Sequence, residues 1–143
     1  MTRTIRFRFE TDATRRMQEV QQFYLDNDGF IDVAINCNDS PALVLHNLGH
    51  PQNHWLALNL LGTRSNRDGI GAKIRLLTDD GRQRSAFVSS GGSYLSASDK
   101  RAHFGLGLSK KVQRIEITWP SGVRQQLESV AADQILTVQE PPR

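Results

Sequence analysis

The sequence predicts an all-β protein, an antiparallel β-sandwich of about seven to eight short strands. Three observations predict this fold class. From residue 55 onward, apolar and polar residues alternate in short runs, and each run ends at Gly, Pro, Asp or Asn, the residues that favour turns. No long segment repeats its apolar residues with the 3.6-residue period of a helix, which disfavours a parallel α/β sheet.

The first strands of the sandwich are predicted between residues 55 and 89. Residues 55–61 alternate leucine with other residues and end at Gly62. Residues 72–78 alternate apolar with basic residues and lead into Asp-Asp-Gly at 79–81. An Asp-Gly pair tolerates positive φ and is typical of a type I′ hairpin turn, so residues 82–89 are predicted to be the return strand.

The remaining strands follow the same pattern. Residues 103–108 are apolar with two glycines, and residues 115–119 alternate Ile, Ile and Trp with polar residues before Pro-Ser-Gly at 120–122. The trailing segments are two predicted strands, 123–127 and 135–139, and one predicted helical turn, 130–134. Trp119 shares its phase with the isoleucines and is therefore predicted to be a core residue.

The chain before residue 54 is organised differently. Residues 1–22 match no known pattern, and within them residues 11–22 fit a short helix that only two apolar anchors would support. Residues 23–47 predict a strand, a tight acidic turn and a second strand, and residues 48–53 predict a linker because they contain Gly and Pro. The first ten residues hold no continuous apolar stretch, so no signal peptide is predicted there.

Composition narrows the function classes. The chain has 143 residues, a formal net charge of +3 and one cysteine, Cys37, which excludes an internal disulfide and a cysteine-built zinc site. Its basic residues are scattered singly, so nucleic acid is not an expected partner. No apolar run approaches the roughly 20 residues that cross a bilayer. Residues 23–50 contain four Asp and neither Lys nor Arg, which makes them an acidic island in a mildly basic chain.

Four motifs in order carry a family resemblance. They are Asn53-His54-Trp55-Leu56 through Leu61-Gly62-Thr63-Arg64-Ser65-Asn66-Arg67-Asp68-Gly69-Ile70-Gly71-Ala72, Ser90-Gly91-Gly92-Ser93-Tyr94-Leu95, His103-Phe104-Gly105-Leu106-Gly107, and Trp119-Pro120-Ser121-Gly122. With these motifs, residues 53–139 resemble the ASPIC/UnbV domain, in a family that includes cartilage acidic protein. Residues 24–32, Tyr-Leu-Asp-Asn-Asp-Gly-Phe-Ile-Asp, are similar to the acidic turn of an FG-GAP/VCBS propeller repeat.

The resemblance implies a division of the chain and a class of function. Residues 1–22 stay unmatched, residues 23–50 are a repeat remnant that forms a partial β-propeller-blade hairpin, and residues 51–143 are the β-sandwich domain. It implies a non-catalytic accessory or binding module, extracellular or periplasmic, at the C-terminal end of a calcium-binding propeller protein. Further propeller repeats are then expected upstream, and an extracellular protein or polysaccharide is the expected partner.

The acidic turn predicts a weak calcium site. Alternate side chains of a tight loop converge on one point, and the glycine permits the sharp turn. Carried over from the repeat, Asp26, Asp28 and Asp32 would be side-chain ligands, and Phe30 would offer its carbonyl. Tyr24 stands where the first Asp is expected, so calcium would bind weakly, at roughly 10⁻⁴–10⁻³ M. The alternative is a plain hairpin turn with solvated acids.

Two loops are candidate ligand sites. In Ser65–Gly71 the candidates are Asn66, Arg67 and Asp68; the alternative there is a turn held by its own Asn or Asp side chain. In Ser90–Asp99 the candidates are Ser93 and Tyr94; the alternative is a wide glycine loop.

These loops also carry the rival function, a carbohydrate-active enzyme or a glycan-binding domain. A glycosidase needs two carboxylates facing each other about 5–10 Å apart, and Asp68 and Asp99 are the loop acids to test as that pair. His46, His50 and His54 recur every four residues, but Gly49 and Pro51 interrupt any helix there, so the three are predicted to be linker residues.

Overall fold

The structure is a computed structural model, and it describes residues 17–37, 40–91 and 97–142. The described residues form ten strands and no helix. The strands are β1 (Met17–Phe23), β2 (Asp32–Cys37), β3 (Ser40–Leu45), β4 (His54–Leu61), β5 (Lys73–Thr78), β6 (Gln83–Phe87), β7 (Ala102–Gly107), β8 (Lys111–Thr118), β9 (Arg124–Ala131) and β10 (Gln134–Gln139). The all-β prediction is confirmed.

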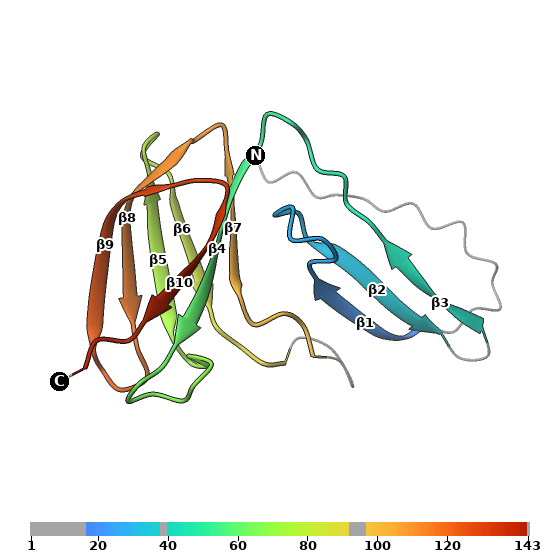
Figure 1. The fold of residues 1–143 in the computed structure, drawn as a ribbon, viewed down its shortest axis with the longest axis horizontal. Coiled ribbons are helices and arrows are strands. Elements are labelled where there is room, and N and C mark those ends of the chain that lie inside the picture. Colours follow the sequence, from blue (N-terminus) through green and yellow to red (C-terminus); the bar gives the residue numbers. More distant parts are fainter. Residues whose placement is uncertain (1–16, 38–39, 92–96, 143) are drawn as a thin grey trace.

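Two sheets built from β4–β10 form the predicted sandwich (Figure 1). One sheet has the order β10-β4-β7 and the other the order β6-β5-β8-β9. Every pair is antiparallel except one, because β10 runs parallel to β4 with Leu136 opposite Leu58. The chain reaches that position by crossing from β9 in the second sheet to β10 in the first.

The core lies between the two sheets, where the alternating residues face inward. On β5 and β8 the buried residues alternate with exposed ones, as the sequence predicts for half-buried strands. Trp119 is 1% exposed and joins this core, and its indole N–H donates to Gln125 Oε1 at 2.9 Å. The core members are Leu56, Leu58, Leu60, Ala72, Ile74, Leu76, Val88, Ala102, Phe104, Leu106, Val112, Ile115, Ile117, Trp119 and Val138.

The Asp-Asp-Gly hairpin forms between β5 and β6, with a different turn from the predicted type I′. Gly81 N–H donates to Thr78 O at 3.0 Å, and among the turn residues only Gly81 has positive φ, at 80°. A type I′ turn needs positive φ at both central residues. The observed pattern is that of a type I turn followed by a left-handed glycine, which adds one bulged residue to the hairpin.

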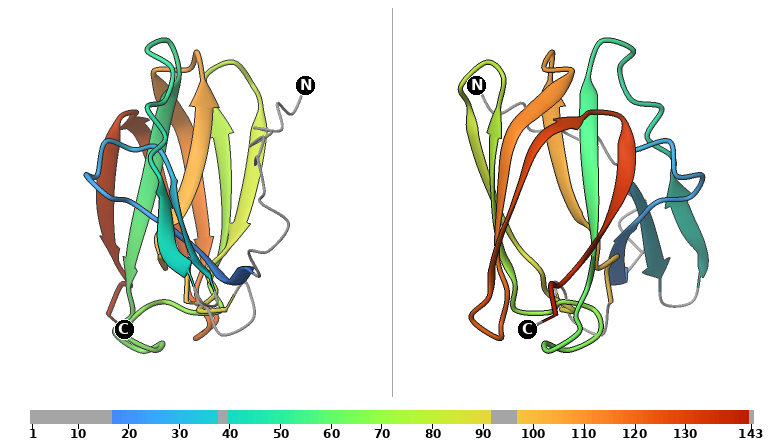
Figure 2. Two further views of the ribbon diagram at one scale, coloured as in Figure 1. Left: turned by 90° about the vertical axis from the view of Figure 1, so that its right-hand side faces the viewer. Right: turned by 60° about the vertical axis from the view of Figure 1, so that its left-hand side comes forward.

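The N-terminal strands form a third sheet, with the order β1-β2-β3, beside the sandwich (Figure 2). Strand β1 occupies the described part of residues 11–22, so the helix considered there is wrong over 17–22, since those residues pair with β2. Residues 1–16 lie outside the described residues. The helical turn considered for 130–134 is also wrong, because β9 continues to Ala131 and β10 begins at Gln134.

Strand β4 is buried on both faces because the N-terminal segment covers its outer side. Leu56 and Leu58 face the sandwich core, whereas Trp55 and Ala57 pack with Tyr24 and Ile31 in a second, smaller cluster.

Within the described residues there is no helix with the length and apolar character needed to cross a bilayer.

Candidate functional site

The acidic turn connects β1 to β2 and gathers three possible metal-ligating side chains. One ligand atom from each of Asp26, Asp28 and His46 lies within 4.8 Å of the other two. His46 follows β3, and its Nε2 is 3.2 Å from Asp26 Oδ2. The turn is held by its own acids, because Asp26 Oδ1 accepts from the Asp28 amide at 3.1 Å and Asp28 Oδ1 from the Phe30 amide at 2.8 Å.

Asp32 is fully buried, unlike Asp26 and Asp28. Its Oδ2 accepts from the Leu25 amide at 2.7 Å and its Oδ1 from the Asn47 amide at 2.8 Å. These two bonds close the acidic turn and tie the end of β3 to it. Asp32 Oδ1 lies 4.0 Å from His46 Nε2, at the edge of the three-residue cluster. The structure therefore brings two of the three predicted carboxylates, those of Asp26 and Asp28, together and adds an imidazole that the sequence placed in a linker.

Tyr24, at the first ligand position of the repeat pattern, docks the turn onto the sandwich. It is 8% exposed, its hydroxyl lies 2.8 Å from His103 Nδ1, and the Arg101 guanidinium stacks 4.2 Å from its ring centroid. Burial raises the pKa of the Tyr24 phenol well above its usual range, and the nearby Asp99 carboxylate adds to this effect. Burial also lowers the pKa of His103. The pair is therefore neutral at pH 7.

The docking surface is tight at Gly29 and polar at its rim. A Cβ built on Gly29, whose φ is +92°, would lie 1.7 Å from Trp55 Cε2. At the rim, Arg101 pairs with Asp99 and also donates to Asn27 Oδ1 at 2.8 Å. The N-terminal segment is thus held against the sandwich by apolar packing in the middle and, at the rim, by the charge-assisted hydrogen bond from Arg101 to Asn27.

The carboxylate of Glu140 binds the start of the Ser65–Gly71 loop and the two residues before it. Glu140 is fully buried, and its Oε2 accepts backbone N–H groups from Thr63 at 2.9 Å and from Arg64 and Ser65 at 2.8 Å. Its Oε1 accepts the Ser65 hydroxyl at 3.0 Å and the Ser121 hydroxyl. Burial would raise the pKa of Glu140, but the hydrogen bonds from Ser121 and the three amides outweigh it and lower the pKa to about 2.

Two predicted ligand residues of this loop have structural partners. Asn66 closes the turn: its amide donates to Ile70 O at 2.7 Å and its Oδ1 accepts from the Ile70 amide at 2.8 Å. Asn66 therefore matches the alternative predicted for this loop, a turn held by the side chain of its own Asn. Asp68 pairs with Lys100. Arg67 is exposed, and its carbonyl accepts from the Gly62 amide at 3.0 Å.

Asp68 and Asp99, the candidate glycosidase pair, line one open cavity of about 520 Å³ with Lys100, Arg101 and Ser98. Each carboxylate is paired with a cation. The hydrogen bond from Lys100 lowers the pKa of Asp68. Burial works against ionisation of Asp99, yet its bonds to Arg101 still lower its pKa. A glycosidase acid needs a raised pKa, so neither carboxyl has the protonation state that this role requires.

The remaining candidate residues either have different partners or lie outside the residues that the structure describes. Ser93 and Tyr94 lie outside the described residues. His54 Nδ1 is 2.6 Å from Asp133 Oδ2 and His50 Nδ1 accepts from the Gln52 amide at 3.4 Å, whereas His46 joins the acidic turn. His50 lies in the predicted linker, but the linker prediction is wrong for His54, which begins β4.

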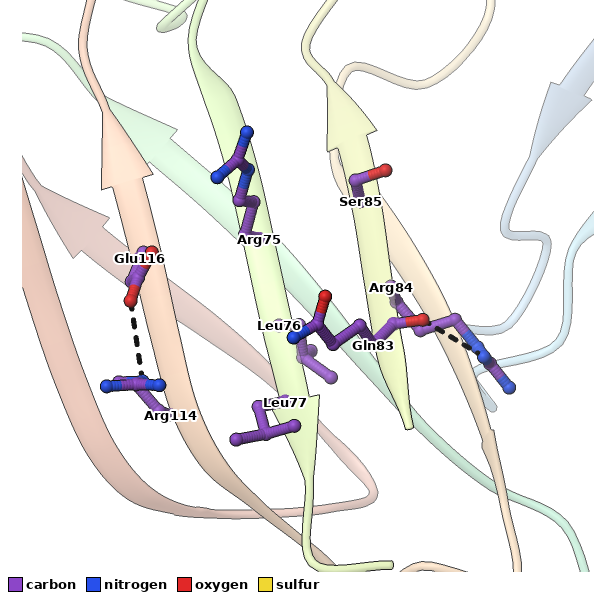
Figure 3. A pocket seen from close by; sticks show the side chains of 8 residues that line it. All are labelled: Arg75, Leu76, Leu77, Gln83, Arg84, Ser85, Arg114 and Glu116. Carbon is purple, nitrogen blue, oxygen red and sulfur yellow. Dashed lines mark hydrogen bonds and ion pairs between the residues drawn. The ribbon is translucent and has the colours of Figure 1, made fainter. Parts of the chain in front are cut away.

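One surface was missed by the sequence reasoning, the outward face of the β6-β5-β8-β9 sheet. Figure 3 shows its central hollow, of about 440 Å³, lined by Arg75, Gln83, Ser85, Arg114 and Glu116 among others. Period-two alternation could have found it, because the polar residues of each strand fall on one face once the apolar ones are assigned to the core.

The comparisons with known proteins agree with the motifs. Residues 62–143 match the family model described as ASPIC and UnbV. Cartilage acidic protein 1 of Mus musculus is 31% identical over 118 residues, covering 80% of this chain and 18% of the relative. The Homo sapiens protein of the same name is 32% identical over 100 residues, covering 68% and 15%. The chain spans less than a fifth of the length of these curated relatives.

Proposed function

This chain belongs to the ASPIC and UnbV family, and from that premise we propose that it is a non-catalytic accessory and binding module that works outside the cytoplasm. The observation that carries the proposal is that residues of the family's motifs make hydrogen bonds within the protein itself. Motif residues Ser65 and Ser121 bind the buried Glu140 carboxylate, and Asn66 closes its own loop. These three side chains hold loops together and so contribute to a rigid scaffold, and their hydrogen bonds leave none of the three free to act as a nucleophile.

The rival function, a carbohydrate-active enzyme, draws its support from the shared cavity of Asp68 and Asp99. Ion pairing of both carboxylates speaks against it, because a paired carboxylate with a lowered pKa is a poor proton donor. The test is the release of reducing ends from plant, bacterial and animal polysaccharides incubated with the chain. We expect none above a buffer blank. Release that disappears in Asp68→Asn or Asp99→Asn would establish the enzyme and end the module proposal.

We further propose that the N-terminal sheet is the remnant of a propeller-type blade and that its acidic turn binds calcium weakly. Supporting this are the antiparallel order β1-β2-β3 and the convergence of Asp26 and Asp28 at the turn. The fit is partial: calcium takes six to eight oxygen ligands, whereas Asp32 already accepts two amides and His46 brings a nitrogen. If bound, calcium would neutralise Asp26 and Asp28 and fix the turn that packs against Trp55.

The partial blade also suggests how the chain fits a longer protein. Among the described residues β3 pairs only with β2, and Val44 on it is 55% exposed. An edge strand with an exposed apolar residue is a place where another strand can pair. Upstream propeller repeats would supply that strand. Expression of the chain together with its upstream coding sequence, followed by amide hydrogen exchange at residues 42–45, tests this: added sequence should slow exchange there.

A further inference from the structure

The outward face of the β6-β5-β8-β9 sheet, called here the outer sheet face, is a regular array of polar side chains. Strand pairing sets them in three rows. Lys73 stands between Phe87 and Thr118, and Arg75 stands between Ser85 and Glu116. Leu77 stands between Gln83 and Arg114, and β9 adds its own residues outside β8. The face comprises Lys73, Arg75, Leu77, Gln83, Ser85, Phe87, Arg114, Glu116, Thr118, Arg124, Gln126 and Glu128.

Two hollows on this face have Arg75 and Glu116 in common among their lining residues, and together they are called here the groove. The hollow of about 440 Å³ over β6, β5 and β8 is lined by Arg75 and Glu116 (Figure 3). A second hollow of about 480 Å³ over β5, β8 and β9 is lined by the same two residues together with Lys73 and Arg124. Together the two hollows extend over the face from β6 to β9, so an extended chain molecule bound along the face would contact both.

The groove is cationic on balance. The outer sheet face around it presents Lys73, Arg75, Arg114 and Arg124 against Glu116 and Glu128, four positive charges to two negative ones. Arg114 Nε lies 3.4 Å from Glu116 Oε1, so one cation is balanced. Lys73, Arg75 and Arg124 make no ion pair with a described residue. Their charges are therefore available for an external anion, and guanidinium groups match carboxylate or sulfate oxygens in two-point hydrogen bonds.

Apolar and neutral groups on the same face suit sugars. Phe87 is 59% exposed and lies beside Lys73. An exposed ring on a flat face can pack against the apolar face of a pyranose, while hydroxyl and amide groups such as Ser85, Gln83 and Gln126 bond its hydroxyls.

We propose that the outer sheet face binds an acidic polysaccharide, one whose sugars carry carboxylate or sulfate groups at intervals. The proposal rests on the chain being a binding module. Glu116 and Glu128 favour this ligand over nucleic acid. A carboxylate accepts hydrogen bonds, which sugar hydroxyls can donate, whereas a phosphodiester backbone offers one negative charge per nucleotide and no donor on its phosphates.

The test is binding of the whole chain to immobilised chondroitin sulfate, polygalacturonate and dextran, with a mixed-sequence DNA duplex alongside, at about 0.15 M ionic strength. We expect binding to the two acidic polysaccharides and none to neutral dextran. The double variant Arg75→Gln with Arg124→Gln should weaken that binding about tenfold, because two charge-assisted contacts are lost.

The matched control is Arg64→Gln with Lys110→Gln, which removes the same charge from exposed residues outside the outer sheet face and outside the two candidate ligand loops. Its binding should stay within about twofold of the unmodified chain if the face, and not net charge, is responsible. Equal losses in both double variants, tighter binding to DNA than to either polysaccharide, or no binding to the acidic polysaccharides would each overturn the proposal. None of these outcomes bears on catalysis, which reducing-end release measures separately.

Discussion

Glu140 Oε1 accepts the Ser65 hydroxyl at 3.0 Å, across 75 residues of sequence, in a part-buried position. Ser65 Oγ in turn accepts from the Ser121 amide at 3.1 Å. Three segments that are far apart in the chain therefore meet on one carboxylate. Two of them, Gly62–Ala72 and Trp119–Gly122, are motifs by which the family is recognised.

Replacing Glu140 should destabilise the fold strongly. In Glu140→Gln the amide oxygen can still accept from the Thr63, Arg64 and Ser65 amides, but the NH2 group then faces the Ser65 and Ser121 hydroxyls, which lose their acceptor, and the negative charge that strengthened all five bonds is gone. We expect the free energy of unfolding to fall by about 3 kcal/mol. Urea unfolding monitored by circular dichroism measures it. The exposed Glu128→Gln is the control and should change by less than about 0.5 kcal/mol; similar losses in both would contradict the clamp.

The same carboxylate predicts acid lability. Its ordinary pKa of 4.5 applies to the unfolded chain, and its pKa in the folded chain is about 2. The stabilisation is complete above the unfolded pKa and is lost as pH falls from about 4.5 toward 2, because the folded state resists protonation that the unfolded state accepts. Urea midpoints measured across that range should fall steeply. In Glu140→Gln the slope should be smaller, and an unchanged slope would assign the acid lability to other carboxylates.

Gly29→Ala should release the N-terminal sheet from the sandwich. The added Cβ would lie 1.7 Å from Trp55 Cε2 on a backbone at φ +92°, so both packing and conformation oppose it. We expect exposure of Trp55 and a red shift of its fluorescence, while the β-sandwich keeps its circular dichroism spectrum. Gly91→Ala, where an added Cβ meets nothing within 4 Å, is the control. An unshifted spectrum in Gly29→Ala would refute the tight docking.

The fold could be predicted because its strands are half-buried, and half-burial imposes a two-residue period that the sequence displays. The parallel placement of β10 could not be predicted, since period two says which side of a strand is apolar but not which strand lies next to it. Trp119 was predicted correctly because its position continues the inward phase of Ile115 and Ile117.

The polar contacts were harder to predict because they join distant segments. His46 meets Asp26 across 20 residues, and its part in the cluster depends on how β3 returns to the turn. Glu140 carried one usable signal: it continues the inward phase of Leu136 and Val138 on β10, so an acid falls at a core position. Because a buried acid needs hydrogen-bond partners, the inward phase of Glu140 would have predicted a buried polar site at this end of β10.

Calcium should bind at the acidic turn with a dissociation constant of roughly 10⁻⁴–10⁻³ M. The reason for weak binding is geometric. Tyr24, at the position of the first ligand, is committed to His103 and Arg101 on the sandwich, so it adds no oxygen to Asp26 and Asp28. Isothermal titration calorimetry at millimolar calcium measures the affinity.

Asp26→Asn tests whether that binding occurs at the turn. It removes one of the two exposed carboxylates that converge there, and we expect it to weaken calcium binding at least about fivefold, because a hard cation depends on ligand charge. Asp79→Asn, an exposed acid in the β5–β6 turn, removes the same charge elsewhere and should leave the affinity unchanged. Equal weakening by both variants would mean that calcium senses only net charge. No heat with the unmodified chain would show that the turn is an ordinary hairpin whose acids are solvated and bonded to its own amides.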